Sequence, residues 1–272
     1  MPPISTRSSS LIVAAAICAG LSVPAEAQAQ DTTSGSGEPR SIWDVTLGAG
    51  AAVRPTYEGS DRYKVSPIPL VNVTWNDMIS LGTTGLSAYW RHENLRVGVG
   101  LTYGLGRTQN NDLFSQGDDR LAGLGDIPAA LGVRGFADYR LGFVNLNASI
   151  TKFTASGNDG VLVNFGAAVP YKLTDATTLV ANVSATWADQ SYMQTYFGVT
   201  STQSANSGFA RYDAGAGIKD VSIGIGLNHK FDQHWAVSAD VRVTRLTGDA
   251  ENSPIVFSKT TATFLSALKY HF

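Results

Sequence analysis

Apolar and polar residues alternate along most of the chain after residue 42. From Trp43 to Arg54 every odd position is apolar, while the even positions are mostly polar, small or charged. A period of two places successive side chains on opposite faces of a β-strand. The first run is as long as a tilted membrane strand, which needs about 9–11 residues, and is longer than the strands of a small soluble sandwich. The same alternation returns at 95–106, 144–151, 179–187, 221–230, 235–244 and 264–272.

The last residues predict how the strands close. Phe264, Leu268, Tyr270 and Phe272 share one face of the final strand, with Ser266 as its only polar member, while Lys269 and His271 lie on the other. A terminal aromatic residue after alternating apolar positions is typical of outer-membrane barrels, so Tyr270 and Phe272 are expected in the aromatic girdle. The edge strand of a soluble sandwich is the alternative. We therefore predict an all-β fold, a transmembrane antiparallel up-and-down β-barrel.

Turn lengths predict the strand count and the orientation. Short turns are expected on the periplasmic side, long loops outside, and an even number of strands returns both termini to the periplasm. Dividing the stretch 78–90 at Gly82–Gly85 satisfies this parity. The resulting twelve strands lie near 43–54, 65–76, 78–82, 86–91, 95–106, 129–139, 143–154, 161–173, 178–189, 218–231, 235–247 and 260–272.

The first residues predict export. Residues 1–27 have the arginine, apolar run and small-residue pattern of a secretory signal peptide, with cleavage also possible at 29. Residues 28–42 contain little to bury and are expected to form a flexible periplasmic tail, followed by the barrel at 43–272. Cys18, the sole cysteine, lies in the signal peptide, so the mature chain has no disulfide or thiolate site. The net charge of −2 gives no indication of a nucleic-acid partner.

Three separated motifs resemble one known family. They are Arg54-Pro55-Thr56-Tyr57-Glu58-Gly59-Ser60-Asp61 followed by Pro67-Ile68-Pro69, then Tyr196-Phe197-Gly198-Val199, and finally the segment from Leu246 to Val256. In this order they are similar to the signature of the MipA/OmpV family of Gram-negative outer-membrane proteins. The resemblance covers essentially the whole mature chain.

The resemblance implies both a location and a role. It implies a barrel in the outer membrane that contacts lipid and lipopolysaccharide and is inserted by the barrel assembly machinery. The name-giving member of the family is a scaffold that brings a membrane-bound lytic transglycosylase together with a bifunctional penicillin-binding protein. Other relatives are linked to adhesion, osmotic response or antibiotic sensitivity, and the family has no common enzymatic activity.

The first loop is open to two interpretations. Prolines 55, 67 and 69 lack backbone donors and are expected to bend strand ends and to leave ladder positions unpaired, and Gly59 can supply a positive backbone angle. One interpretation is a rigid loop that folds over or into the barrel mouth. The other is a recognition surface for a partner or ligand, with Tyr57, Glu58, Asp61 and Tyr63 exposed. Asp249 belongs to a second motif, which we expect to pack against the first because barrel closure brings the first and last hairpins together.

Charged residues on the inward face suggest a filled lumen. They include both signs, which argues against strong ion selectivity, so a hydrated, salt-bridged interior is favoured over a narrow channel for small solutes. Adhesion through the loop 190–217 is a third possibility. No histidine stands beside an evident serine and acid, so we predict no enzymatic activity, no cofactor and no metal. The inward charges include Asp44, Arg96, Arg134, Asp138, Lys152, Lys172, Asp240, Arg242, Lys269 and His271.

Overall fold

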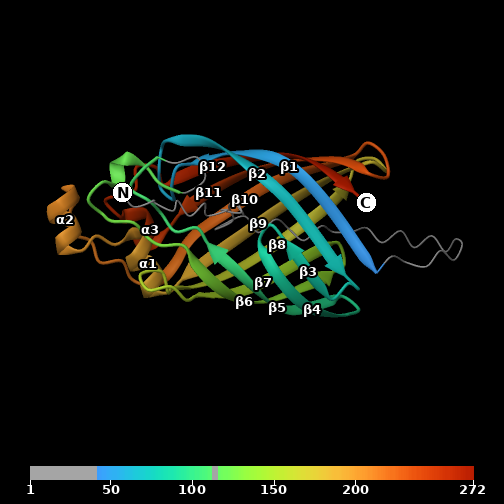
Figure 1. The fold of residues 1–272 in the computed structure, drawn as a ribbon, viewed down its shortest axis with the longest axis horizontal. Helices are drawn as coiled ribbons and strands as arrows, with labels where there is room; N and C mark the ends of the chain where they lie inside the picture. Colours follow the sequence, from blue (N-terminus) through green and yellow to red (C-terminus); the bar gives the residue numbers. More distant parts are fainter. Residues whose placement is uncertain (1–41, 112–115) are drawn as a thin grey trace, which may run out of the picture.

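Twelve antiparallel strands close into one barrel in the computed structural model, which describes residues 42–111 and 116–272 (Figure 1). The predicted signal peptide at 1–27, and the predicted tail apart from residue 42, lie outside the described residues. Each strand pairs with its neighbours in sequence, and β1 closes on β12. The strands are β1 (Trp43–Pro55), β2 (Tyr63–Trp75), β3 (Ile79–Gly82), β4 (Gly85–His92), β5 (Leu95–Gly104), β6 (Ala130–Leu141), β7 (Val144–Phe153), β8 (Val161–Lys172), β9 (Thr177–Ala188), β10 (Gly217–Lys230), β11 (Trp235–Leu246) and β12 (Thr260–His271).

The predicted fold class and strand count are confirmed, and every predicted strand boundary lies within two residues of the observed one. Short turns gather at one end of the barrel, which we call the inner end. Long loops gather at the other, which we call the outer end (Figure 1). In bacterial membrane barrels these correspond to the periplasmic and extracellular sides. The long loops span 56–62, 105–129, 154–160, 189–216 and 247–259.

Glycine makes the closing seam possible. Gly48 lies opposite Lys269 and Gly50 lies opposite Ala267 across the seam between β1 and β12. A Cβ at Gly48 would lie 2.5 Å from the carbonyl oxygen of Leu268, so a larger residue would push the two strands apart. At the inner end of this seam Tyr270 packs against Phe272, with ring centroids 4.8 Å apart.

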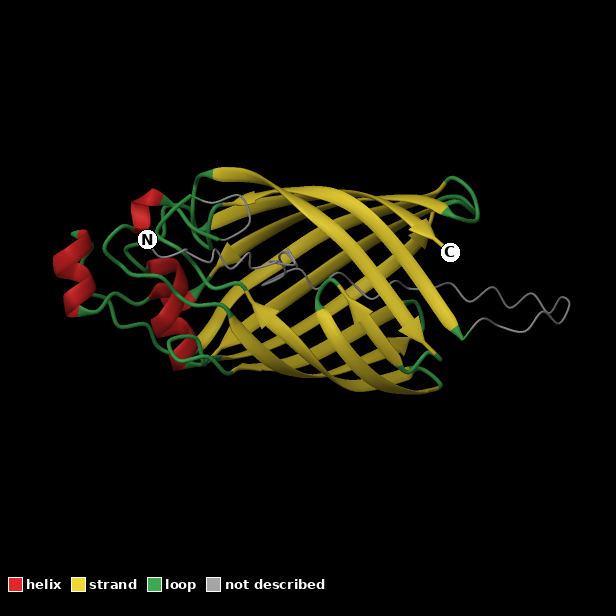
Figure 2. Ribbon diagram, viewed as in Figure 1, coloured by secondary structure: helices red, strands yellow, loops and turns green. Residues whose placement is uncertain are grey.

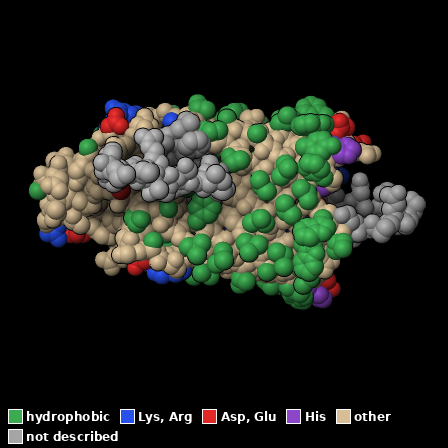
Figure 3. Space-filling view, in the orientation of Figure 1, with side chains coloured by type: hydrophobic (Ala, Val, Ile, Leu, Met, Phe, Trp, Pro, Cys, Tyr) green, Lys and Arg blue, Asp and Glu red, His purple; other side chains and the backbone are tan. Residues whose placement is uncertain are grey.

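The barrel exposes apolar side chains around its outside. Val99 is 64% exposed and Phe165 is 56% exposed, although both lie in the middle of long strands. Figure 3 shows apolar side chains spread over the strands, with most charged side chains near the two ends of the molecule. A water-soluble protein rarely exposes so continuous an apolar surface, whereas lipid contact requires one.

Lys152 corrects one sequence-based expectation. It lies opposite Val133 in the register of β6 and β7, and Val133 is exposed on the outside. Directly opposed residues share a face, so Lys152 points outward and the expectation that it points into the lumen is wrong. Its position near the outer end of β7 lets its ammonium group donate to the carbonyl oxygen of Asp159 in the adjoining loop. A long cationic side chain can reach the membrane interface in this way.

Short helices occur in the loops of the outer end (Figure 2). They are η1 (Asp119–Leu121), α1 (Gln190–Phe197), α2 (Ser201–Ser207) and α3 (Gly248–Asn252). Within the part of the chain that the structure describes, no helix has the length and apolar character needed to cross a membrane. The helices cover the outer end of the barrel, where the predicted site residues also lie.

Candidate functional site

The long loops pack together over the outer end and form a structure that we call the outer cap. It consists of the described parts of the five loops 56–62, 105–129, 154–160, 189–216 and 247–259. The cap has a buried apolar interior of its own. One cluster joins Tyr57, Leu121, Leu124, Val199 and Ile255, and a second includes Ile127, Phe153, Tyr192, Met193, Tyr196, Phe197, Leu246 and Ala250. The interpretation of the first loop as a rigid element folded over the mouth agrees with this packing.

Tyr57 lies inside the cap and not on its surface. Only 1% of the residue is exposed, and its hydroxyl donates to the carbonyl oxygen of Ile255 at 2.9 Å. Burial raises the pKa of Tyr57, and the nearby carboxylate of Asp118 adds to this effect. The expectation that Tyr57 is exposed is therefore wrong. The last loop covers the aromatic ring and supplies the acceptor that its hydroxyl needs.

Gly59 carries the second contact between the first and last loops. Its carbonyl oxygen accepts from the amides of Phe257 at 2.8 Å and Ser258 at 2.9 Å. Its φ is +93°, and a Cβ here would lie 2.6 Å from a methyl group of Val256. Both the backbone angle and the close approach require glycine. The predicted packing of the first motif against the last is thus present in the structure.

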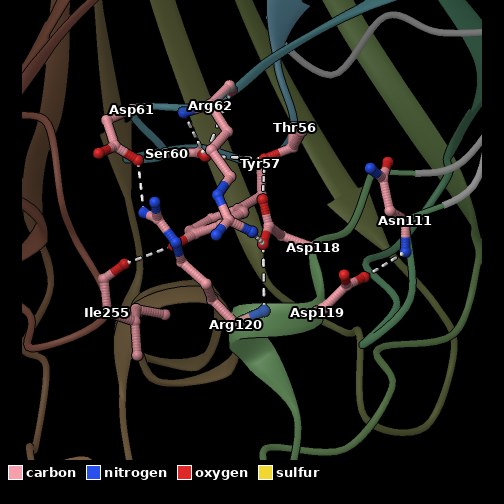
Figure 4. Close-up of polar contacts among 10 residues, drawn as sticks. All are labelled: Thr56, Tyr57, Ser60, Asp61, Arg62, Asn111, Asp118, Asp119, Arg120 and Ile255. Atoms are coloured by element: carbon pink, nitrogen blue, oxygen red, sulfur yellow. Dashed lines mark hydrogen bonds and ion pairs between the residues drawn. The ribbon is translucent and has the colours of Figure 1, made fainter.

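Asp118 joins the first loop to the loop 105–129 (Figure 4). Thr56 Oγ1 donates to its carboxylate at 2.9 Å, Arg62 Nη1 at 2.9 Å and the backbone amide of Arg120 at 3.1 Å. The last contact caps the N-terminus of η1. Burial alone would raise the pKa of Asp118. The hydrogen bonds from Arg120 and Thr56, with the positive charge of Arg62, hold that pKa below its usual value.

Sequence reasoning missed Asp118, because two acidic residues after a glycine usually mark a solvated loop tip. Its side chain is only 1% exposed, whereas that of the next residue, Asp119, is exposed and contacts the amide of Asn111 at 3.3 Å. The two acids look equivalent in the sequence and differ because the first loop covers only one of them.

Asp61 and Tyr63 reach the surface, as predicted. The Asp61 carboxylate pairs with Arg120, whose guanidinium lies 4.5 Å from the ring centroid of Phe257. The hydroxyl of Tyr63 accepts from the amide of Ala262 at 3.0 Å and so connects the start of β2 to β12. Side-chain exposure is 48% for Asp61, and Tyr63 is 47% exposed, which leaves both available to a partner.

Glu58 belongs to a buried ionic group. Both of its carboxylate oxygens lie 3.0 Å from the ammonium group of Lys219, which also pairs with Asp220 at 2.6 Å. The side chains of Lys219 and Asp220 are almost fully buried. Glu58 is therefore less exposed than predicted, because it supplies one of two carboxylates to a lysine at the outer end of β10.

Arg107 links two loops of the outer cap, 105–129 and 189–216. It is buried, and its Nη1 donates to the carbonyl oxygen of Tyr196 at 2.6 Å. Burial lowers the pKa of Arg107. Tyr196 stacks on Tyr192 with ring centroids 4.3 Å apart, and burial raises the pKa of Tyr196 to about 12. Sequence reasoning did not single out Arg107. Its partner is the backbone carbonyl of Tyr196, 89 residues away, and every residue has such a group, so no side-chain pattern indicates the pair.

Asp249 acts within the cap and does not contact the first loop. Its Oδ2 accepts from the amide of Gly215 at 2.7 Å, and its carbonyl oxygen accepts from the hydroxyl of Tyr212 at 2.9 Å. These bonds join α3 to the segment that follows α2. Four of the five predicted site residues therefore lie in the cap, with Tyr63 beside it at the start of β2, and their polar groups pair with other residues of the cap and of the adjoining strands.

Apart from Lys152, the predicted lumen charges Arg96, Arg134, Asp138, Asp240 and Arg242 lie on the inward face. Arg96 pairs with Asp138 at 2.7 Å, and its guanidinium also lies 5.1 Å from the ring centroid of Tyr89. Arg134 lies against the ring of Phe136, Asp240 packs over Gly226, and Arg242 lines a small cavity with Asn182. Among the described residues, no three His, Cys, Asp or Glu side chains are grouped closely enough to hold a metal ion.

Similar proteins are found by sequence and by structure. The MltA-interacting proteins of Escherichia coli K12 and Shigella flexneri are each 23% identical to this chain over 233 residues. That match covers 84% of this chain and 90% of each relative. Among solved structures, OmpT of Vibrio cholerae has a TM-score of 0.40 at 10% identity, covering 85% of this chain and 97% of that one. An outer-membrane channel from Pseudomonas putida F1 has a TM-score of 0.39 at 12% identity, covering 87% and 100%.

A family model provides the assignment. The model described as MltA-interacting protein MipA matches residues 47–272, which is every strand from the middle of β1 to the last residue. The matched region includes both the closing seam and the outer cap. This chain therefore belongs to the MipA family.

Proposed function

We propose that this protein is a non-enzymatic scaffold of the Gram-negative outer membrane that holds a lytic transglycosylase at its inner end. The observation that carries the proposal is the self-contained outer cap. Asp118 and Arg107 pair with groups within the cap, and Glu58 pairs with Lys219 at the adjoining end of β10, so the three residues form a structural closure and do not converge on a substrate. The names of the relatives, MltA-interacting proteins, support a partner of this kind.

The inner end offers the surface for such a partner. Its short turns carry exposed side chains of both signs, which we call the inner rim. Asp77 pairs with Arg91 at 3.0 Å while both remain about half exposed. Charges at the edge of an interface mainly set orientation and the rate of association. The other members of the inner rim are Arg140, Lys172, Asp175, Lys230 and Asp232.

The family resemblance extends the proposal to a second enzyme. A scaffold that also binds a bifunctional penicillin-binding protein would link murein hydrolysis to murein synthesis. Both enzymes would reach the barrel from the periplasm, where the inner rim is placed by its short turns. Export by a signal peptide and insertion by the barrel assembly machinery belong to the same proposal.

Charge reversal on the inner rim tests the scaffold. We expect the double change Arg140→Glu and Lys230→Glu to reduce recovery of the lytic transglycosylase in a crosslinked pull-down from intact envelopes. Arg211→Glu is the matched control, because Arg211 is an exposed arginine on the outer cap. The proposal is wrong if wild-type protein recovers no murein enzyme, or if the control reduces recovery as much as the rim variant.

A narrow channel is the alternative for the same barrel. An axial path would have to pass the outer cap, where Tyr57, Met193 and Phe197 are fully buried. We therefore expect no conductance steps of porin size when purified protein is inserted into a planar bilayer. Adhesion through the loop 190–217 stays a prediction; α2 is the part of that loop with no buried residue and so is the part to alter.

A further inference from the structure

The barrel wall is incomplete beside β2. β3 pairs with β2 only from Asn72 to Trp75, and the pairing of β4 with β5 ends at Leu86 and Leu101. Beyond these points, the described strand residues 63–71 of β2 are registered with β1 alone, and 102–104 of β5 with β6 alone. Figure 1 shows that β3 and β4 stop partway along the wall. We call this interruption in the strand pairing, between the unpaired edges of β2 and β5, the window.

Hydrogen bonds of two threonines form the boundary of the window nearer the inner end. The hydroxyl of Thr83 accepts from the amide of Val71 at 3.1 Å and lies 3.3 Å from the carbonyl oxygen of Pro69. On the other side, Thr102 Oγ1 donates to the carbonyl oxygen of Thr84 at 2.8 Å. The tip of the β3–β4 hairpin is thus tied to both flanking strands. Because adjacent strands lie about 4.8 Å apart, β2 and β5 are separated at this level by roughly 14 Å.

The upper frame of the window is the outer cap. The amide of Gly117 donates to the carbonyl oxygen of Thr56 at 2.8 Å, and Asp118 binds Thr56 and Arg62. These bonds join the loop that leaves β5 to the loop that enters β2. The window is therefore enclosed above and below by hydrogen-bonded structure, and it lies in the outer half of the barrel wall.

The β2 edge of the window is poorly suited to pairing with another strand. Pro69 and Val71 direct their carbonyl groups toward Thr83, on the window side. Backbone groups of alternate residues point to the same side of a strand, so Pro67 also faces the window. Neither proline has an N–H group to donate. Prolines at such positions prevent edge-to-edge association, so a second strand is not the favoured occupant.

The interior behind the window is apolar. Ile68 forms a buried cluster with Ala52 and Leu265, and Leu70 and Leu105 pack against it. Leu105 directly follows β5, so its contact with this cluster reaches across from the opposite edge of the window. Deeper in the barrel, the inward face carries charged pairs such as Arg96 and Asp138. The apolar cluster therefore differs from these charged parts of the inward face.

The outside of the window is apolar as well. Val65 and Val71 on β2 and Leu101 on β5 are exposed on the lipid-facing side. Apolar side chains thus lie outside both edges, and the cluster on the inside is buried with Leu105 packed against it. A path between the two apolar regions crosses only the unpaired strand edges and the Leu105 side chain. A ligand that follows this path needs no hydrogen bonds from the strand edges. An acyl chain meets that requirement, and the surrounding lipid supplies it at high concentration.

We propose that the window admits an acyl chain of an outer-leaflet lipid, which enters the barrel laterally and contacts Ile68, Leu70 and Leu105. Leu105 is the side chain that narrows the passage, because it comes from one edge and packs on the other. The cap closes the axial route above, so the lateral route is the one that the wall leaves. This binding site is independent of any partner at the inner rim.

A photoactivatable lipid tests the window directly. Wild-type protein is reconstituted in phosphatidylethanolamine and phosphatidylglycerol vesicles that contain phosphatidylcholine with a diazirine in its acyl chain. After irradiation, mass spectrometry of peptides locates the adducts. We expect adducts on the inward residues Ile68, Leu70 or Leu105 in addition to outward residues such as Phe165. Outward adducts alone would overturn the proposal, and so would crosslinks between two protein chains along β2.

Two substitutions at Leu105 test the passage in opposite directions. Leu105→Trp should reduce the inward adducts several-fold, and Leu105→Ala should increase them, while adducts on Phe165 stay constant. Heat-dependent migration in electrophoresis shows which variants are folded barrels. If the tryptophan variant does not fold, the alanine variant decides the question. Inward labelling that the folded variants leave unchanged would contradict the proposal.

Discussion

Replacing Asp118 by alanine should loosen the outer cap without unfolding the barrel. The carboxylate is almost fully buried and has three donors, from Thr56, Arg62 and Arg120. Alanine removes all three bonds and leaves the buried hydroxyl of Thr56 without this acceptor. The strands keep their own pairing, because Asp118 lies in a loop.

The expected size follows from these contacts. A hydrogen bond from a buried hydroxyl to a charged acceptor contributes about 1.5–3 kcal/mol. The hydrogen bond from the amide of Arg120, by which Asp118 caps the N-terminus of η1, adds about 1 kcal/mol. The pair with Arg62 adds less than about 1 kcal/mol, because the arginine side chain is half exposed. The free energy of local opening should therefore fall by about 3 kcal/mol, which corresponds to roughly 100-fold faster exchange of protected amides.

Hydrogen exchange of the folded protein in detergent measures this effect. Peptides covering 116–127 and the first loop should exchange faster in the Asp118→Ala variant, while peptides from β8 and β9 should not change. Asp119→Ala is the matched control, since the neighbouring carboxylate is exposed and, among the residues that the structure describes, accepts from the amide of Asn111 at 3.3 Å. Equal exchange in the two variants would refute the view that Asp118 holds the loops together.

Three further outcomes follow from the cap. Gly59→Ala should open the contact between the first and last loops more than Gly125→Ala does, measured by the same exchange. Both glycines have positive φ, but a Cβ at Gly125 meets nothing within 4 Å. Lys219→Met should lower the temperature at which the folded electrophoretic band disappears more than Glu58→Gln does, because it leaves the buried carboxylate of Asp220 and the partly buried carboxylate of Glu58 without their cation; equal shifts would contradict this. The pKa of Asp118 is lowered in the folded cap, so its stabilisation should be complete above about pH 4 and lost as the pH falls further. Cap exchange that rises already between pH 7 and 5, after correction for intrinsic rates, would show that another group controls the cap.

The strands could be predicted because each one is specified locally. The alternation from Trp43 to Val53 is visible in the sequence alone. In a membrane barrel the apolar face must contact lipid and the polar face must line the lumen, so the orientation of the strand follows. The division at Gly82–Gly85 followed from parity, and the structure places a tight turn there with Gly85 at a φ of +129°. Errors at strand ends stay within two residues because polar loop residues begin where the apolar face stops.

The cap could not be predicted in the same way, because its contacts join distant parts of the chain. Tyr57 is buried by Ile255, which is 198 residues away. No local pattern distinguishes a tyrosine that a later loop will cover from one that stays exposed. The helices left a clearer signal: Thr200 and Gln203 form a capping box at the start of α2, and their spacing is visible in the sequence.

Pro67 and Pro69 show how local sequence and long-range structure combine. The prolines were expected to bend a strand end, yet β2 runs through both and stays in register with β1. They are tolerated because their missing donors face the side where β3 has already ended. Proline at these positions would be costly in a complete wall, since each would remove a ladder hydrogen bond inside the membrane. The Pro-x-Pro sequence is therefore compatible with the barrel wall because the β3–β4 hairpin is short. Because β3 ends early, the part of β2 beside the window has no strand among the described residues to pair with on that side. Pro67 and Pro69 suit this position, since neither has an N–H group that would need an acceptor.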